Sequence, residues 1–131
     1  MTGSRYSRAV LESFDNPQHA GRAEGSGPEL AVGRAGSPRA GAVIELSLKV
    51  AQGSVRQARF RAFGCPHTIA AASRLAVAIE GLSVDALEGF DVRSLAAELD
   101  LPAWKLGRLL ILEDALAGCI ADWKRRQPPA G

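Results

Sequence analysis

Residues 59–69 read RFRAFGCPHTI, and this stretch decides the fold because it joins a strand to a helix. Its alternating part predicts a strand that ends at Phe63, and Gly64 permits a sharp turn. Pro66 stands where a helix takes its first residue, because the N–H that proline lacks is one that a helix leaves unpaired anyway. Cys65 is therefore expected at the helix N-cap, beside backbone N–H groups and the positive end of the helix dipole. A thiol in such a place tends towards the thiolate, which suits a metal ligand or a sulfur acceptor.

The segments before this junction alternate in polarity as strands do. Residues 43–50 put apolar side chains on one face and polar ones on the other, and residues 55–63 repeat the pattern after a hairpin at 51–54. Further upstream, a short edge strand over 29–33 and a glycine- and proline-rich turn over 33–41 are expected. The sheet should therefore be antiparallel, with helices on only one face.

Helical periodicity fills most of the remaining chain. The two short helices should open at the capping residues Ser83 and Asp91. Residues 18–28 are rich in small residues and predict a mobile loop, in which His19 would be a solvated loop histidine. Residues 127–131 predict a frayed tail. Apolar residues at helical spacing predict helices over 6–14, 66–80, 83–87, 91–99 and 106–126.

Length and composition bound the class of protein. The chain has 131 residues, enough for one domain (residues 1–131) with a single core. A net charge of +2 is too small for the dense basic surface of nucleic-acid binders, and no apolar run approaches the roughly 20 residues of a membrane span. Two distant cysteines do not make a disulfide framework, and the first residues lack the apolar core of a secretory signal. These features predict a cytoplasmic, reduced protein.

A long series of residues stands in the order and spacing of one known family. On these residues the chain resembles the IscU/NifU-type iron–sulfur cluster assembly scaffold family. The resemblance implies an α+β fold, a three-stranded antiparallel sheet with helices packed on one face. It also implies a cluster site at one end, where loops and helix ends converge. The matching residues are Asn16, Pro17, Gly21, Gly36, Ser37, Pro38, Gly41, Phe60, Phe63, Gly64, Cys65, Ile69, Ala70, Ser73, Gly81, Leu99, Leu101, Pro102, Lys105, Leu106, Glu113, Asp114, Ala115, Ile120, Ala121 and Asp122.

The resemblance implies a ligand set that this sequence keeps only in part. Family members hold the nascent cluster with three cysteines, assisted by an aspartate and a histidine, and thiolates are soft ligands that suit iron. The first family cysteine falls on Ala40 and the nearby aspartate on Ala42. The family histidine falls on Gly107 and the third cysteine on Arg108, whose guanidinium stays protonated and cannot bind a metal. Cys65 is the family ligand that this sequence retains.

Other residues offer weaker metal ligands. His67 stands two residues after Cys65 and could supply one nitrogen, although a first-turn surface residue is the simpler interpretation. Glu113 and Asp114 fit a solvated helix face better than a ligand pair. Cys119 lies beside the apolar stripe of the last helix and needs no function beyond that of a small buried hydrophobe.

Two arginines give the site a different electrostatic character. Arg39 and Arg108 are candidate neighbours of Cys65, and positive charge stabilises a thiolate or a bound anion while it disfavours iron. Cys65 could therefore be an inert remnant of the family fold or a reactive thiolate that accepts a persulfide sulfur. An anion-binding role for the arginines and the adjacent helix N-terminus is a third reading.

A second family segment concerns partners. Residues 101–105, Leu101-Pro102-Ala103-Trp104-Lys105, resemble the family's Leu-Pro-Pro-Val-Lys segment, which the chaperone of cluster transfer recognises. Ala103 and Trp104 depart from that pattern, and Trp104 fits either a core or rim aromatic or a contact anchor. The early region around Tyr6 is where family members meet the cysteine desulfurase.

Two functional hypotheses follow. The first is an iron–sulfur cluster assembly protein with a degenerate site, in which Cys65 binds iron or a cluster weakly or accepts sulfur. A homodimer could then supply a second thiolate. The alternative is a non-metal adaptor or regulator that keeps the fold and its surfaces for a desulfurase, a chaperone or a true scaffold protein. No nucleophile–base–acid trio and no phosphate-binding glycine loop points to an enzyme.

Overall fold

The computed structural model describes residues 7–15, 17–102 and 106–128. Its three strands form one antiparallel sheet in the order β1-β2-β3, as the sequence predicts. None of the described helices is long and apolar enough to cross a membrane. The elements follow one another as α1 (Arg8–Asp15), the 3-10 helix η1 (Gly27–Glu29), β1 (Leu30–Ser37), β2 (Ala42–Ala51), β3 (Ser54–Phe63), α2 (Pro66–Ile79), α3 (Val84–Glu88), α4 (Ser94–Leu99) and α5 (Gly107–Arg126).

Strand β1 is longer than the sequence predicts. A short strand over 29–33 and a turn over 33–41 were the expectations, yet β1 pairs with β2 along its whole length. The turn prediction is wrong for its first half because Gly33 serves helix packing: a Cβ there would press into the backbone of α5. Only residues 38–41 reverse the chain, and Gly41 takes the positive φ of 83° that such a turn requires.

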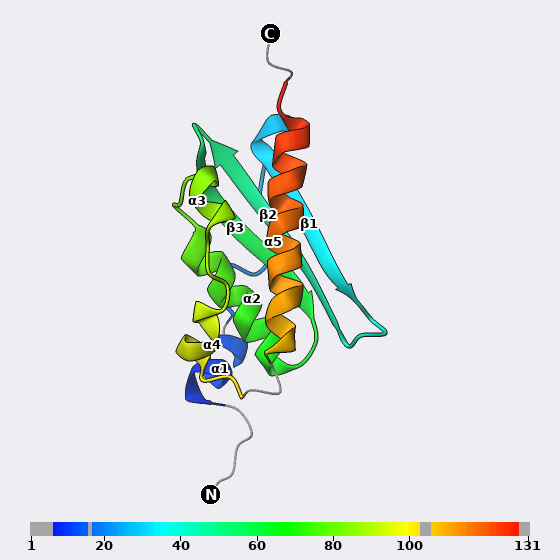
Figure 1. Cartoon of the computed structure of the whole chain (residues 1–131), viewed down its shortest axis with the longest axis vertical. Helices are drawn as coiled ribbons and strands as arrows, with labels where there is room; N and C mark the ends of the chain where they lie inside the picture. Colours follow the sequence, from blue (N-terminus) through cyan, green and yellow to red (C-terminus); the bar gives the residue numbers. More distant parts are fainter. Residues whose placement is uncertain (1–6, 16, 103–105, 129–131) are drawn as a thin grey trace, which may run out of the picture.

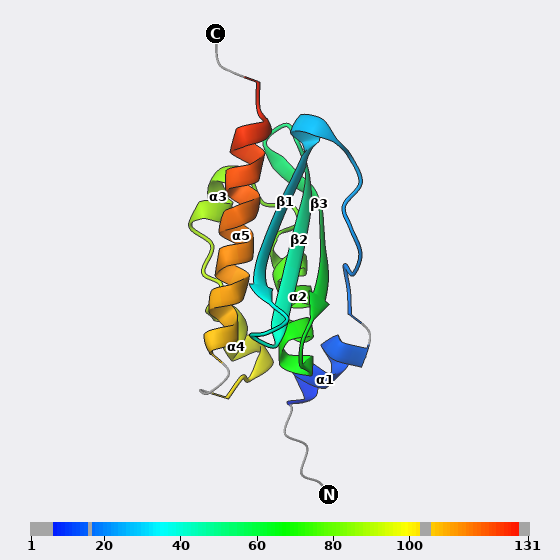
Figure 2. The ribbon, with the colours of Figure 1, turned by 90° about the vertical axis from the view of Figure 1, so that its right-hand side faces the viewer.

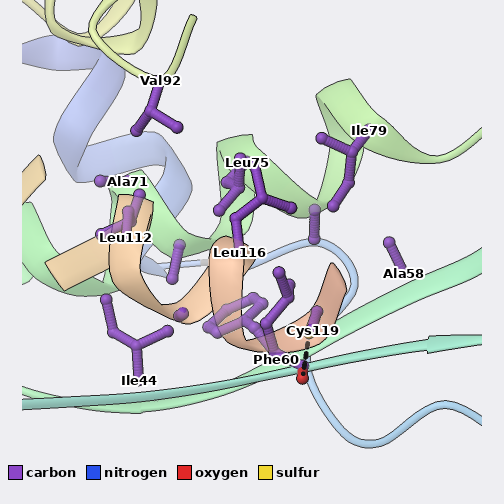
Figure 3. Packing of buried hydrophobic residues seen from close by; sticks show 14 of the residues in the cluster. Ile44, Ala58, Phe60, Ala71, Leu75, Ile79, Val92, Leu112, Leu116 and Cys119 are labelled. Atoms are coloured by element: carbon purple, nitrogen blue, oxygen red, sulfur yellow. Dashed lines mark hydrogen bonds between the residues drawn. The ribbon is translucent and has the colours of Figure 1, made fainter. Parts of the chain in front are cut away.

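Helices α2 and α5 cover one face of the sheet, which confirms the predicted arrangement. α5 packs over β1 and β2, and α2 packs over β3 (Figure 1). Phe60 of the sheet belongs to one buried cluster with Leu75 of α2 and with Leu112 and Leu116 of α5 (Figure 3). The predicted inward row of β2 is at most 4% exposed. It consists of Ile44, Leu46, Leu48 and Val50.

Residues 18–28 run along the side of the sheet away from α5 (Figure 2). The N–H of Ala23 donates to the Ser47 hydroxyl at 2.8 Å, and the N–H of Gly21 donates to the Phe60 carbonyl at 2.8 Å. This segment is therefore hydrogen-bonded both to the backbone of β3 and to the Ser47 side chain of β2. The predicted mobility of the rest of the segment stays a prediction.

Of the two short helices, α3 begins as predicted and α4 begins later. Ser83 caps α3 as predicted, because its hydroxyl accepts from the N–H of Ala86 at 3.2 Å. Asp91 does not cap a helix: its carboxylate accepts from the N–H of Arg93 at 3.0 Å, and α4 begins only at Ser94. An aspartate that bonds the backbone two residues ahead makes a turn, which delays the helix.

Candidate functional site

Three segments that are distant in sequence lie at the same end of the molecule. They are the β1–β2 turn (residues 38–41), the junction between β3 and α2, and the first turn of α5. All three lie at the end of the molecule near α1 and α4 in two perpendicular views (Figures 1 and 2). This is the end at which the family resemblance places the cluster site.

Cys65 occupies the N-cap of α2, as predicted. Its φ of −75° and ψ of 168° are extended, Pro66 opens the helix, and the side chain is half-buried. The Sγ atom lies 3.6 Å from the Thr68 hydroxyl, one turn into the helix. Gly64 is required before it, because φ is 155° and an added Cβ would lie 2.9 Å from the Cβ of Thr68. The strand-to-helix junction thus fixes the thiol at the helix N-terminus, where negative charge is favoured.

His67 is not the surface residue that the sequence suggests. Its side chain is 1% exposed in the first turn of α2. The reason is helical spacing, since positions 67, 71 and 75 share one face and Ala71 and Leu75 belong to the core. To bind a metal at the surface, the imidazole would have to leave this enclosed position.

Arg108 joins two of the three segments. Its Nη1 donates to the carbonyl oxygen of Ala40 at 3.2 Å, so the first turn of α5 holds the β1–β2 turn. Arg39 lies exposed in that same turn. The structure therefore brings both arginines to the end of the molecule that carries Cys65. Their direct convergence on the thiol stays a prediction.

Cys119 is excluded from the site by its position. It is fully buried in α5, and its thiol donates to the carbonyl of Leu46 at 3.0 Å (Figure 3). Burial raises the pKa of the Cys119 thiol well above its ordinary value. The prediction of a small buried residue is confirmed, and Cys119 cannot serve as a surface thiolate.

The remaining predicted residues do not add ligands. Glu113 lies 3.6 Å from Arg93 in an ion pair, and Asp114 is exposed. No group of three or more His, Cys, Asp or Glu residues that could hold a metal ion occurs in the part of the chain that the structure describes. Of the predicted partner segment, Leu101 and Pro102 are half-buried, while residues 103–105 lie outside the described residues.

One polar cluster lies at the C-terminal end of α2, the end opposite Cys65, and has no signature in the sequence. His19 was expected in solvent, but its side chain is only 21% exposed and its Nδ1 lies 3.0 Å from the Ala58 carbonyl oxygen. The Glu80 carboxylate lies 3.4 Å from that nitrogen and 2.9 Å from Arg59. Burial would raise the pKa of Glu80, but the N–H of Ala58 and the Arg59 guanidinium hold it below its ordinary value. Because these residues are far apart in sequence, no local pattern could have revealed the cluster.

Comparison with known proteins agrees with this geometry. The family model described as NifU-like N terminal domain matches residues 5–129. The iron–sulfur cluster assembly scaffold protein IscU of Escherichia coli K12 is 32% identical over 123 residues, which are 93% of this chain and 96% of that protein. IscU of Azotobacter vinelandii is 30% identical and covers the same shares. The crystal structure of a NifU-like protein (N-terminal) from Brucella abortus superposes with a TM-score of 0.68 at 20% identity, covering 92% of this chain and 95% of that one.

Proposed function

The chain belongs to the family of NifU-like N-terminal domains, and on this basis we propose that it takes part in iron–sulfur cluster assembly as a carrier that works through Cys65. The observation that carries the proposal is the Cys65 thiol at the N-cap of α2, at the end of the molecule where the three segments lie. The role is one of binding and handing on, not of enzymatic catalysis. It belongs to the cytoplasm, where thiols stay reduced.

The cargo is the substrate of this protein, and the donor set limits what a single chain can hold. An iron–sulfur cluster is usually held by about four cysteine thiolates. Here Cys65 is the one thiol at the site, because Cys119 is sealed in the core and His67 is enclosed. Arg108 adds positive charge to the same end. The described residues of one chain therefore do not fit a complete cluster, and we limit the proposal to sulfur or a single iron bond at Cys65.

Sulfur acceptance is the step that these residues support best. The Cys65 thiolate attacks the outer sulfur of a donor's persulfide, a new S–S bond forms, and the donor's own S–S bond breaks. The donor leaves as a thiolate, so the number of electrons is unchanged. The N-terminus of α2 stabilises the attacking thiolate. We expect the donor to be a cysteine desulfurase and the later recipient of the sulfur to be a true scaffold protein. Residues 101–105 would contact a transfer chaperone.

The test compares wild type with Cys65→Ser, and with Cys119→Ser as the matched thiol control. Each protein is purified without oxygen, analysed for iron and sulfide, and then incubated with a cysteine desulfurase and cysteine. Intact-mass spectrometry under non-reducing conditions counts the added sulfur atoms. We expect wild type and Cys119→Ser to gain sulfur and Cys65→Ser to gain none.

Two outcomes would contradict the proposal. Sulfur or iron retained in full by Cys65→Ser would show that another group carries the cargo. A wild-type protein that takes up neither sulfur nor iron, yet binds the desulfurase or a scaffold protein, would favour the adaptor role instead.

A further inference from the structure

The polar face of the sheet has a hollow beside the site, which we call the Phe63 patch. It is lined by Arg34, Val43, Glu45, Arg61, Ala62 and Phe63, and its volume is about 360 Å³. The pairing of the strands explains the lining, because Glu45 of β2 stands between Arg34 of β1 and Arg61 of β3. Phe63 follows on β3, opposite Val43 and two residues before Cys65.

Phe63 is the most exposed large apolar residue among those that the structure describes. Its side chain is 60% exposed. It is the last residue of β3, and the opposite face of that strand packs in the core. Residues 18–28 are hydrogen-bonded to the Ser47 side chain and to the backbone of Phe60, and none of residues 18–28 lines the hollow. The Phe63 patch is therefore an amphipathic surface left open next to the site.

The charges of the patch favour an anionic partner. The Arg61 guanidinium donates two hydrogen bonds, of 3.0 and 2.8 Å, to one oxygen of the Glu45 carboxylate. Arg34 stands across from the same carboxylate in the strand register but makes no ion pair within the described chain. The three strands together carry five basic side chains and one acidic side chain, although the whole chain has a net charge of only +2. The excess of positive charge is thus concentrated on the sheet.

We propose that the Phe63 patch docks an acidic segment of a partner protein that also carries an apolar side chain. A carboxylate of the segment pairs with the Arg34 guanidinium, whose planar fork suits bidentate binding. The apolar side chain of the segment fills the hollow against Val43, Ala62 and Phe63. Because Cys65 follows Phe63 by two residues, a partner held here would have its neighbouring surface next to the thiol. The docking does not require Cys65 itself, so it stands apart from the proposed sulfur chemistry.

The structure favours a peptide over a nucleic acid at this surface. Nucleic-acid binders usually neutralise several phosphates along a basic stripe, whereas this patch offers two arginines with Glu45 between them. An exposed phenylalanine beside a half-buried valine suits an aliphatic or aromatic side chain of a peptide.

In the experiment, a short capped peptide of alternating Asp and Leu residues is titrated into the whole ¹⁵N-labelled chain. Binding is monitored through the amide chemical shifts of the chain. We expect saturable shifts that centre on the patch, no such shifts with the matching Lys and Leu peptide, and weakening by added salt. Arg34→Glu should weaken binding by about tenfold, the value of one charge-assisted hydrogen bond, and Phe63→Ala should weaken it as well.

Two control variants make the result specific. Arg56→Glu places the same charge change at the other end of β3, and it should alter the dissociation constant by less than about twofold because distant exposed charges are screened. Cys65→Ser should bind the peptide as wild type does, whatever the sulfur assay shows. Equal loss in Arg34→Glu and Arg56→Glu, or no saturable shift in wild type, would overturn the proposal.

Two further outcomes would also overturn it by assigning the surface to another occupant. One is a dimer in sedimentation velocity that Phe63→Ala abolishes, which would give the patch to a second copy of this chain. The other is binding of a single-stranded oligothymidine that Arg34→Glu abolishes and that displaces the peptide.

Discussion

Replacing Gly33 with alanine should push α5 away from β1 and destabilise the fold. A Cβ at Gly33 would lie within 3.0 Å of backbone atoms of Ala115, Gly118 and Cys119, and the carbonyl carbon of Gly118 would be 2.9 Å away. Ordinary carbon contacts are about 3.5–4.0 Å, so the Gly118 contact alone requires α5 to withdraw by about 0.6 Å. The Ala115 carbonyl oxygen and the Cys119 nitrogen lie closer still to the added Cβ and require a larger shift. Because the opposing atoms are backbone, no rotamer change can relieve the contact. Overpacking of this kind costs about 1–3 kcal/mol, and we expect the upper half of that range.

The assay is urea denaturation followed by far-ultraviolet circular dichroism, with a thermal melt as a second measure. A loss of about 2–3 kcal/mol should lower the melting temperature by about 8–12 °C in a chain of this size. Gly107→Ala is the matched control, since nothing lies within 4 Å of its added Cβ and alanine favours the helix by up to about 1 kcal/mol. If Gly33→Ala melts within about 2 °C of wild type, the close packing of α5 against Gly33 does not contribute to the stability of the chain as we argue.

Three further predictions test other parts of the structure. Asp122→Asn should lower the free energy of unfolding at neutral pH by about 2 kcal/mol: burial would raise the pKa of Asp122, but its backbone and arginine hydrogen bonds hold that pKa low. The stabilisation is lost as the pH falls through the lowered pKa, so the urea curves of variant and wild type should converge only at pH values below the ordinary pKa of aspartate. A constant gap between the curves would contradict this. Iodoacetamide should alkylate Cys65 in the native chain and Cys119 only in urea, because burial raises the pKa of Cys119; two adducts on the native chain by mass spectrometry would refute this. Arg108→Ala should speed amide exchange in the β1–β2 turn around Ala40 while changing the free energy of unfolding by less than about 1 kcal/mol, and unchanged exchange would show that the contact does not hold the turn.

The sequence predicted the elements of this fold where the signal was local. Alternation located β2 and β3, helical spacing located α2 and α5, and the Gly64–Pro66 junction placed Cys65 at a helix N-cap. The failure at β1 has a physical cause. A glycine can mark a turn or a close approach, and these two uses look the same in sequence. Gly33 is a close approach, whereas Gly41 is a turn.

The site was predictable only as far as its place in the fold. His67 looked exposed because its position in the first turn of α2 says nothing about which face the core covers. The cluster of His19, Arg59 and Glu80 joins residues up to 61 positions apart, and no periodicity reports such a contact. The Phe63 patch likewise depends on the pairing of three strands, which the sequence indicates only in outline.

Two of the interactions that hold the fold together lie away from Cys65 and Arg108. At one edge of the sheet, the Asp122 carboxylate accepts from the N–H of Val32 at 2.8 Å, which ties α5 to β1. At the other edge, the Glu80 carboxylate accepts from the N–H of Ala58 at 2.9 Å, which ties the end of α2 to β3. Both carboxylates lie away from the β1–β2 turn, so a change of the side chain at position 108 leaves them intact. A metal is therefore not needed to keep the sheet and its two long helices together.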